Sequence, residues 1–414
     1  MLHHSIFLVR RNRVMKSVYD AEENCCGCSA CYSICPRQAI AMEEDSKGFR
    51  YPIIDNSKCV GCGLCKRVCR FPLNKENLGD IQRFFAIKHK DKKVVRSSQS
   101  GGAFTLFSDW ILEQNGVIYG AKLNTSDFSV SHVRADSAGQ RDLMRGSKYV
   151  QSDMNGCFDL VASDLLNGRF VLFSGTPCHC DGLLSFLDLK HINVDRLYTA
   201  DIICHGVPSQ KMFKSFVKWN EKRYGITVSN FLFREKYKYP WGKHIEKIVF
   251  ENGKTVYSEW FANIFYNDCS LRGSCFNCHY AFPVRNTDLT YADFWGIGKC
   301  RPEMNDRYGC SALIVHSEKG LDLLEKLRYN AIITEVCKCD LVDPQPHLHG
   351  SVTVPKNYKQ FWMDYKNLDF EEFLLRYSYN TVTITNTLKT NFKLLAKFPF
   401  RVLRKFFGFL KTIH

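Results

Sequence analysis

Nine of the chain's twenty cysteines crowd into residues 25–69. They contain two runs of the spacing Cys-x-x-Cys-x-x-Cys-x-x-x-Cys, formed by Cys25, Cys28, Cys31 and Cys35 and then by Cys59, Cys62, Cys65 and Cys69. In this pattern the two-residue gaps bring three thiolates to one [4Fe–4S] cluster, and the fourth cysteine ligates the other cluster. The sequence therefore predicts two clusters, one held by Cys25, Cys28, Cys31 and Cys69 and the other by Cys59, Cys62, Cys65 and Cys35.

A pair of zinc sites is the alternative interpretation of these eight cysteines, and the doubled register argues against it. Cys26 falls outside the register, and we interpret it as a non-ligand. Cys-x-x-Cys spacings indicate metal ligation in a reducing compartment rather than disulfides, so we expect a cytoplasmic protein.

Four further cysteines follow predicted strands or form a metal-type pair. Cys178 and Cys204 each come at the end of an apolar β-rich run, and Cys275-x-x-Cys278 is half a metal site. Strand ends at one edge of an α/β sheet are where such folds place their sites, so these four thiols are expected to hold a third cluster. The alternative is that they are small buried hydrophobic residues, and Cys180 and Cys269 lie close enough in the sequence to compete as ligands. We interpret the remaining cysteines as core or surface thiols: Cys157, Cys300, Cys310, Cys337 and Cys339.

The elements that must position these residues alternate between strand and helix patterns after residue 81, which predicts a mixed rather than purely parallel α/β core. Apolar periodicity predicts helices over 103–114, 155–167, 181–189, 210–224 and 318–329, and Asn252-Gly253 predicts a hairpin turn. We expect an α+β ferredoxin-like domain followed by a mixed α/β flavoprotein domain. The predicted divisions are a basic N-terminal extension (1–20), a two-cluster ferredoxin-type domain (21–76), an oxidoreductase domain (81–345) and a C-terminal extension (346–414).

Two turn motifs could face a phosphate. Ser98-x-Ser100-Gly101-Gly102 precedes a predicted helix, whose first N–H groups are free to bind an anion, and Gly146-Ser147-Lys148-Tyr149 places a cation beside another turn. Each motif alone is more often a simple turn. The fingerprint Gly-x-Gly-x-x-Gly is absent from the sequence, so a Rossmann-type nicotinamide site has no support.

Six segments in fixed order resemble one known family. They are SSQSGGAF (97–104), GSKYVQS (146–152), FSGTPCHCDGLL (173–184), DIICHGVPSQ (201–210), SCFNC (274–278) and TDLTYADFWGI (287–297). Over roughly residues 20–330 the chain resembles the coenzyme F420 hydrogenase/dehydrogenase beta-subunit family, in its bacterial form with a fused N-terminal ferredoxin. The resemblance implies a flavoprotein with FAD beside an iron–sulfur cluster. We then expect Ser100, Gly101, Gly102 and Lys148 near the FAD phosphates, with His205 and Asp293 at the ring or delivering protons; a structural role is the alternative for His205.

Joining iron–sulfur clusters to a flavin has a physical purpose, because clusters pass single electrons whereas a flavin stores two. The sequence thus predicts an FAD- and iron–sulfur-dependent oxidoreductase that takes electrons from a ferredoxin-like donor to an organic acceptor. The family resemblance suggests a role in polysaccharide biosynthesis. The alternative is a non-catalytic electron-transfer subunit that serves a partner enzyme. A nucleic-acid-binding protein is disfavoured, because the basic charge comes with no recognition element.

The formal net charge of +15 has a conspicuous share in the last residues. Residues 389–414 contain no acid and combine aromatic and aliphatic bulk with seven basic residues: Lys389, Lys393, Lys397, Arg401, Arg404, Lys405 and Lys411. A basic face against an apolar face is typical of a helix lying on an anionic leaflet, so we expect peripheral contact with the inner face of the cell membrane. A C-terminal helix docked on the core is the alternative. No run of eighteen apolar residues occurs, and a spanning helix is not expected.

Overall fold

The computed structural model describes residues 17–71, 81–154 and 156–378. The predicted N-terminal extension lies mostly outside these ranges, and the predicted membrane-contacting segment 389–414 lies wholly outside them. Within these described ranges, no helix combines the length and apolar character needed to cross a bilayer.

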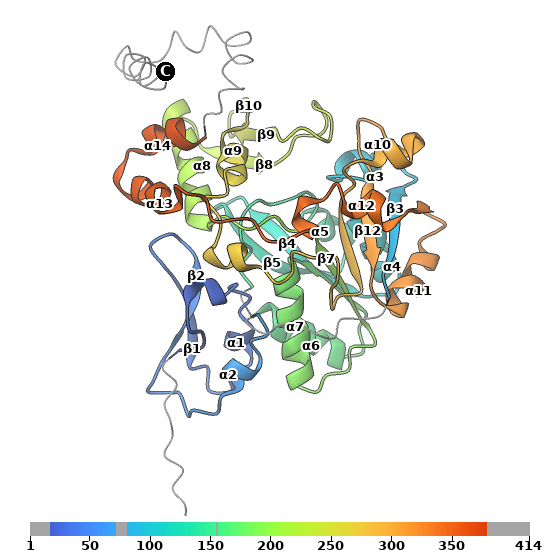
Figure 1. Ribbon diagram of the computed structural model, residues 1–414, viewed down its shortest axis with the longest axis horizontal. Coiled ribbons are helices and arrows are strands. Elements are labelled where there is room, and N and C mark those ends of the chain that lie inside the picture. The colour runs from blue at the N-terminus through green and yellow to red at the C-terminus, as the bar shows by residue number, and fades with distance from the viewer. Residues whose placement is uncertain (1–16, 72–80, 155, 379–414) are drawn as a thin grey trace, which may run out of the picture.

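The N-terminal cysteine runs fold into a small unit that contains one antiparallel hairpin, β1 (Ile40–Glu44) with β2 (Arg50–Ile54). Each run continues into a single helical turn, α1 (Ala30–Ser33) or α2 (Leu64–Arg67). The unit, drawn in blue in Figure 1, lies beside α6 and α7 of the larger domain. It shares a hydrophobic core with those helices through residues such as Ile34, Ile40 and Val68.

The larger domain is built on an eight-stranded sheet of order β13-β3-β12-β11-β7-β6-β4-β5. Strands β11, β7, β6 and β4 are parallel neighbours, whereas β12, β13 and β5 run antiparallel to the strands beside them, so the prediction of a mixed sheet is confirmed. The bounds are β3 (Arg83–His89), β4 (Val117–Asn124), β5 (Ser129–Ala135), β6 (Val171–Gly175), β7 (Leu197–Ile202), β11 (Leu289–Asp293), β12 (Ser311–Val315) and β13 (Ala331–Glu335).

Helices cover both faces of this sheet, because successive strand side chains point to opposite sides. Val171 and Phe173 of β6 pack with α6 (Cys157–Leu166) and α7 (Pro177–Leu189). Leu172 faces the other side and packs with α4 (Ala103–Glu113) and α11 (Glu318–Lys326).

Helix α7 begins four residues earlier than the sequence pattern predicted. Pro177 opens the helix, and a proline suits the first helical position because its missing N–H would have no partner there. Cys178 therefore lies in the first turn of α7 rather than in a turn before it. Helix α7 also approaches the cysteine-rich unit closely at Gly182, where an added Cβ would lie 2.9 Å from the Cys28 Sγ.

An aromatic-rich subdomain completes the fold. A three-stranded antiparallel sheet, β8 (Val228–Leu232), β9 (Glu246–Phe250) and β10 (Thr255–Ser258), turns between its last two strands at the predicted Asn252-Gly253. It packs with α8 (Gln210–Tyr224), α9 (Trp260–Tyr266), α13 (Tyr358–Asn367) and α14 (Phe370–Tyr377). The other helices are short: η1 (Glu22–Asn24), α3 (Lys92–Ser97), α5 (Ala138–Asp142), η2 (Gly273–Asn277), α10 (Ile297–Cys300), η3 (Pro302–Met304), α12 (Lys338–Val342) and η4 (Pro346–Leu348).

Candidate metal centres and the adjoining sheet edge

The four cysteines predicted to hold one of the two clusters surround a small cavity at the outer end of the cysteine-rich unit. The cavity is lined by Cys59, Cys62, Cys65 and Cys35, with apolar side chains from β1, β2 and α2. Three cysteines thus come from the second run and one from the first, the exchange that the spacing predicts. Cys62 is exposed, so this end of the molecule is open to solvent.

The other predicted set lies on the inner side, against the larger domain. Burial and then the neighbouring thiolates of Cys28 and Cys25 raise the pKa of Cys69 to about 12, which places the last cysteine of the second run beside the first run. Among the residues that the structure describes, no group of three or more Cys, His, Asp or Glu side chains could hold a single metal ion.

A second cysteine-lined cavity lies at the carboxyl edge of the large sheet. It is lined by Cys178, Cys204, Cys275 and Cys278, the four predicted ligands of a third cluster, and also by Cys26. Burial and then the thiolates of Cys275, Cys178 and Cys278 raise the pKa of Cys204 well above its usual value. Thiols packed this closely become thiolates together only with a positive centre among them, so the donor set fits an iron–sulfur cluster.

Buried hydrogen bonds hold the loops that carry these thiols. Asp181 of α7 accepts from the Tyr280 hydroxyl (2.6 Å) and from Asn286 (2.9 Å), which fastens the Cys275–Cys278 loop to the helix that carries Cys178. The backbone N–H of Arg272 donates to the carbonyl of Val207 (3.0 Å), which joins the same loop to the segment after Cys204.

The two competing cysteines lie elsewhere. Cys180 points into the hydrophobic core between α6, α7 and the sheet, and Cys269 is buried in the aromatic-rich subdomain. Neither lines the cavity. Cys157 and Cys310 are core thiols, and Cys337 and Cys339 are exposed, as predicted.

Cys26 occupies a position that the sequence did not indicate. Its thiol interacts with both Cys28 and Cys178, and these hydrogen bonds raise the pKa of Cys26 well above its usual value. Cys26 packs with Phe71 and Tyr280 in one small apolar cluster against Cys28, Cys178 and Cys278. It therefore connects the inner ferredoxin-type set to the cavity at the sheet edge.

Arg272 is a buried cation between the same two cysteine sets, and the sequence pattern missed it. Its side chain donates to the carbonyls of Cys25 (2.8 Å) and Arg50 (2.9 Å) and to Gln151 Oε1 (3.0 Å), and Nη2 lies 3.7 Å from the Cys25 Sγ. The guanidinium lies 4.1 Å from the ring centroid of Tyr51, and Arg272 also lines the sheet-edge cavity.

Arg272 is only 1% exposed, and within the described part of the chain it forms no salt bridge with a carboxylate. A buried charge without a counter-charge is costly. The anionic thiolates of the two cysteine sets supply that counter-charge, so Arg272 fits a site that carries negatively charged clusters on both sides.

Three of the four predicted FAD-phosphate residues, Ser100, Gly101 and Gly102, stand at the same edge of the sheet. Gly101 lies against Ile87 at the end of β3 and donates its N–H to Ser311 Oγ (2.9 Å), and Ser311 is paired in register with Asp293. The Ser100 hydroxyl donates to the Cys310 carbonyl (2.5 Å). Gly102 begins α4 with a φ of 92°, a left-handed conformation that favours glycine.

Lys148 donates to the carbonyls of Met144 (2.6 Å) and Arg145 (2.9 Å). Burial lowers its pKa to about 7. The structure thus ties this ammonium group, like Ser100 and Gly101, to protein partners, and their contact with a phosphate stays a prediction.

The two predicted polar residues have firm partners. His205 lines the cysteine cavity, lies 2.5 Å from Asp268 Oδ1 through Nε2, and packs on His347 with ring centroids 4.1 Å apart. Asp293 ends β11 and accepts from the buried Arg234 (2.5 Å). His205 therefore belongs to the cavity, and Asp293 to the neighbouring sheet edge.

Buried Lys236 was also missed by the sequence reasoning. Its ammonium group donates to the carbonyls of Ser100 (2.9 Å), Val95 (2.6 Å) and Tyr308 (2.6 Å), and burial lowers its pKa to about 7. The only sequence signal for Arg234 and Lys236 is their basic charge in a segment that follows a strand.

Two family models match the chain. Residues 168–338 match the model of the C-terminal part of the coenzyme F420 hydrogenase/dehydrogenase beta subunit, and residues 24–72 match the 4Fe-4S dicluster domain. These matches confirm the family resemblance and the fused iron–sulfur domain predicted from the motifs. The first match includes four of the cysteines that line the sheet-edge cavity: Cys178, Cys204, Cys275 and Cys278.

Two curated relatives cover different parts of the chain. The coenzyme F420-dependent sulfite reductase of Methanocaldococcus jannaschii is 28% identical over 161 residues, which are 38% of this chain and 24% of the relative. The pyruvate synthase subunit PorD of Thermotoga maritima is 43% identical over 58 residues, 14% of this chain and 52% of the relative. The chain thus spans about a quarter and about half of the lengths of these two relatives.

Among solved structures, the chain is similar to one in the F420-reducing [NiFe] hydrogenase complex from Methanosarcina barkeri. The two are 16% identical with a TM-score of 0.47, and the similarity covers 70% of this chain and 94% of the other.

Proposed function

We propose that this chain, which joins a 4Fe-4S dicluster domain to the C-terminal domain of the coenzyme F420 hydrogenase/dehydrogenase beta subunit, is an iron–sulfur oxidoreductase. Electrons would enter from a ferredoxin-like donor, pass through three [4Fe–4S] sites, and reach a flavin-type cofactor and an organic acceptor. A role in polysaccharide assembly rests on the family resemblance alone.

One observation carries the proposal. Cys178, Cys204, Cys275 and Cys278 line one cavity, and Cys26 joins this cavity to the inner cysteine set of the dicluster domain. A row of sites then runs from the exposed Cys62 to the carboxyl edge of the sheet. Such a row connects the protein surface with chemistry at the buried edge.

A two-electron cofactor at that edge would convert single electrons into pairs. FAD is the cofactor we propose. The names of two similar proteins mention coenzyme F420, so the extracted cofactor has to be identified as FAD or as coenzyme F420. Ser100, Gly101, Gly102 and Lys148 would lie nearest its phosphates. His205 and Asp293 would hold or position protons between the cysteine cavity and the cofactor ring.

The alternative is a subunit that only carries electrons to a partner enzyme. The similarity to pyruvate synthase subunit PorD favours it for the dicluster domain, because that protein is named as a subunit of a larger enzyme. The two functions differ in what the isolated chain can do.

Anaerobic purification followed by assay of iron, acid-labile sulfide and released cofactor tests the proposal. We expect about twelve irons per chain, from the four irons of each cubane, together with one flavin or deazaflavin. An added dye acceptor should be reduced by the chain alone. A chain that holds its irons, releases no such cofactor and reduces no acceptor without another protein would favour the electron-carrier function.

A further inference from the structure

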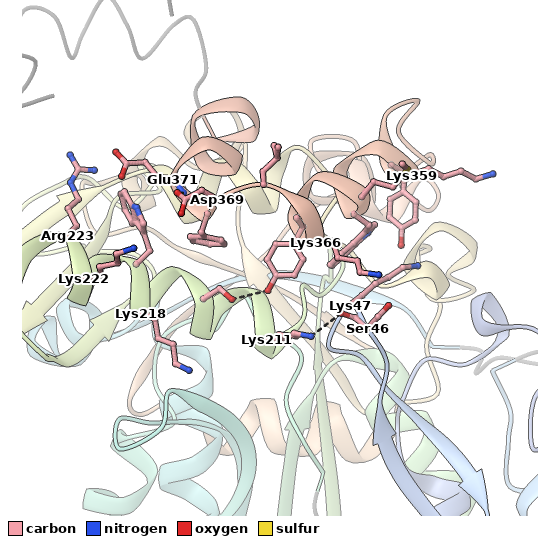
Figure 2. Close-up of a pocket in the computed structure, with 18 residues that line it drawn as sticks. Ser46, Lys47, Lys211, Lys218, Lys222, Arg223, Lys359, Lys366, Asp369 and Glu371 are labelled. Carbon is pink, nitrogen blue, oxygen red and sulfur yellow. Dashed lines mark hydrogen bonds between the residues drawn. The ribbon is translucent and has the colours of Figure 1, made fainter. Parts of the chain in front are cut away.

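A large groove lies on the surface beside the cysteine-rich unit. Its volume is about 1000 Å³, and it runs between α8, α13 and the start of α14, with the β1–β2 turn at one end (Figure 2). Its lining contains only two acids, Asp369 and Glu371, against seven basic residues: Lys47, Lys211, Lys218, Lys222, Arg223, Lys359 and Lys366. Five aromatic side chains lie between them: Trp219, Tyr358, Trp362, Tyr365 and Phe370.

The basic side of the groove follows from the pattern of α8. Lys211, Lys218 and Lys222 recur at spacings of seven and four residues, so they share one face of the helix. The opposite face carries Phe213 and Phe216, which are buried in the aromatic-rich subdomain. Helix α8 is thus fixed by its apolar face, and its lysines line the groove. In Figure 2, Lys211 points toward Ser46 of the β1–β2 turn, and Lys218 points away from α13 at the outer side of α8.

The lysines of the groove are not neutralised by carboxylates from within the described ranges. There, none of the six lysines has a carboxylate within 4.0 Å. Lys211 donates to the carbonyl of Ser46 (3.2 Å), and Lys47 lies over the rings of Tyr358 and Trp362. Like charges held together repel one another, and an anionic partner would relieve that repulsion.

One wall of the groove leads to the cysteine cavity. The ring of Tyr358 lies 5.1 Å from that of Phe276, and Phe276 stands between Cys275 and Cys278 in the sequence. The Tyr358 hydroxyl donates to the Leu271 carbonyl (3.3 Å), at the base of the same loop. A partner in the groove would therefore sit two aromatic rings away from the sheet-edge cysteines.

We propose that this groove docks a small acidic electron-transfer protein, the donor that the proposed function requires. The partner gives one electron to the iron–sulfur sites and is itself oxidised by one electron, with no bond made or broken. Charge complementarity selects an acidic partner, and the position of Tyr358 and Phe276 favours a redox protein over other anions. The basic segment 389–414 carries charge of the same sign as the groove and is disfavoured as its occupant.

The test uses the full chain, oxidised under anaerobic conditions, and an acidic two-[4Fe–4S] ferredoxin reduced beforehand. Stopped-flow absorbance follows reduction of the chain's iron–sulfur sites. Lys218→Glu combined with Lys222→Glu reverses two groove charges. The matched control combines Lys92→Glu and Lys93→Glu, two exposed lysines in α3 on the opposite side of Figure 1. Reduced methyl viologen, a small cation that needs no acidic docking site, serves as the second donor.

Electrostatically steered association changes by ten-fold or more with charge and falls with ionic strength. We expect the groove variant to slow reduction by ferredoxin at least ten-fold and to weaken its salt dependence, with viologen rates unchanged. The control pair should change the ferredoxin rate less than three-fold. Equal effects of the two pairs, or no effect of either, would overturn the groove as the docking site.

Two outcomes separate this proposal from others. A chain that viologen cannot reduce contradicts the proposed function itself, whereas a chain reduced by viologen but indifferent to the groove charges contradicts only the docking site. If the groove variant loses binding to phosphatidylglycerol vesicles while its ferredoxin rate is unchanged, the groove is a membrane contact and the proposal is wrong.

Discussion

Arg272 offers a direct perturbation of the charge between the two inner cysteine sets. We expect Arg272→Met to shift the reduction potential of the neighbouring clusters to more negative values. Without the buried cation, the negative charge added on reduction is no longer stabilised by electrostatic attraction. Its Nη2 lies 3.7 Å from the Cys25 Sγ. At an effective dielectric constant near 20, and with the cluster charge spread over several atoms, the lost interaction is on the order of 2–3 kcal/mol. For one electron this corresponds to about 100 mV.

The assay is an anaerobic redox titration followed by electron paramagnetic resonance, with iron counted in each sample. Arg272→Lys keeps the charge but loses the hydrogen-bonding fork, so it should retain most of the potential if charge is the cause. Arg141 is the matched control, since it is 3% exposed but paired with Asp109. Unchanged potentials in Arg272→Met with full iron content, or an equal shift in Arg141→Met, would refute the reasoning.

Two further predictions concern packing and pH. Gly182→Ala would place a Cβ 2.9 Å from the Cys28 Sγ, so α7 and the cysteine-rich unit should separate. We expect this variant to lose about four irons per chain, the content of one cubane. The control is Gly139→Ala, where the added Cβ meets nothing within 4 Å, and it should keep all its iron. Burial lowers the pKa of Lys148 to about 7, below that of a lysine in the unfolded chain. Above pH 7 the unfolded state therefore binds more protons than the folded state. The free energy of unfolding should then rise with pH from about 7 to 10. In Lys148→Met this contribution should vanish from thermal unfolding measured between pH 7 and 9, leaving the contribution of Lys236. An unchanged pH dependence would contradict the lowered pKa of Lys148.

The sequence predicted the parts of the site that depend on local spacing. The exchange of Cys35 and Cys69 between the two runs is a prediction from the repeat alone. In the structure Cys35 lines a cavity with Cys59, Cys62 and Cys65, and Cys69 lies near Cys28 and Cys25. Cys178 and Cys204 were placed at one sheet edge because each follows a predicted strand, and both line the cavity at that edge. The hairpin at Asn252-Gly253 was recognised from its turn residues.

Features that depend on the docking of distant segments could not be predicted. Cys26 has no spacing signal, and its position between Cys28 and Cys178 arises only when α7 meets the cysteine-rich unit. Arg272 resembles any loop arginine until its burial is known. The basic groove combines residues from α8, α13 and the β1–β2 turn, which lie more than a hundred residues apart along the chain.

The iron content of Cys204→Ser tests the central claim most directly, because Cys204 lines the sheet-edge cavity and belongs to neither ferredoxin-type run. Cys180→Ser is the matched control, a fully buried cysteine two residues from Cys178 that packs in the core instead. With anaerobically prepared chains, we predict that Cys204→Ser loses about four of twelve irons and keeps the eight of the dicluster domain, while Cys180→Ser keeps all twelve. Equal iron content in Cys204→Ser and the parent chain would contradict a third cluster at the sheet edge.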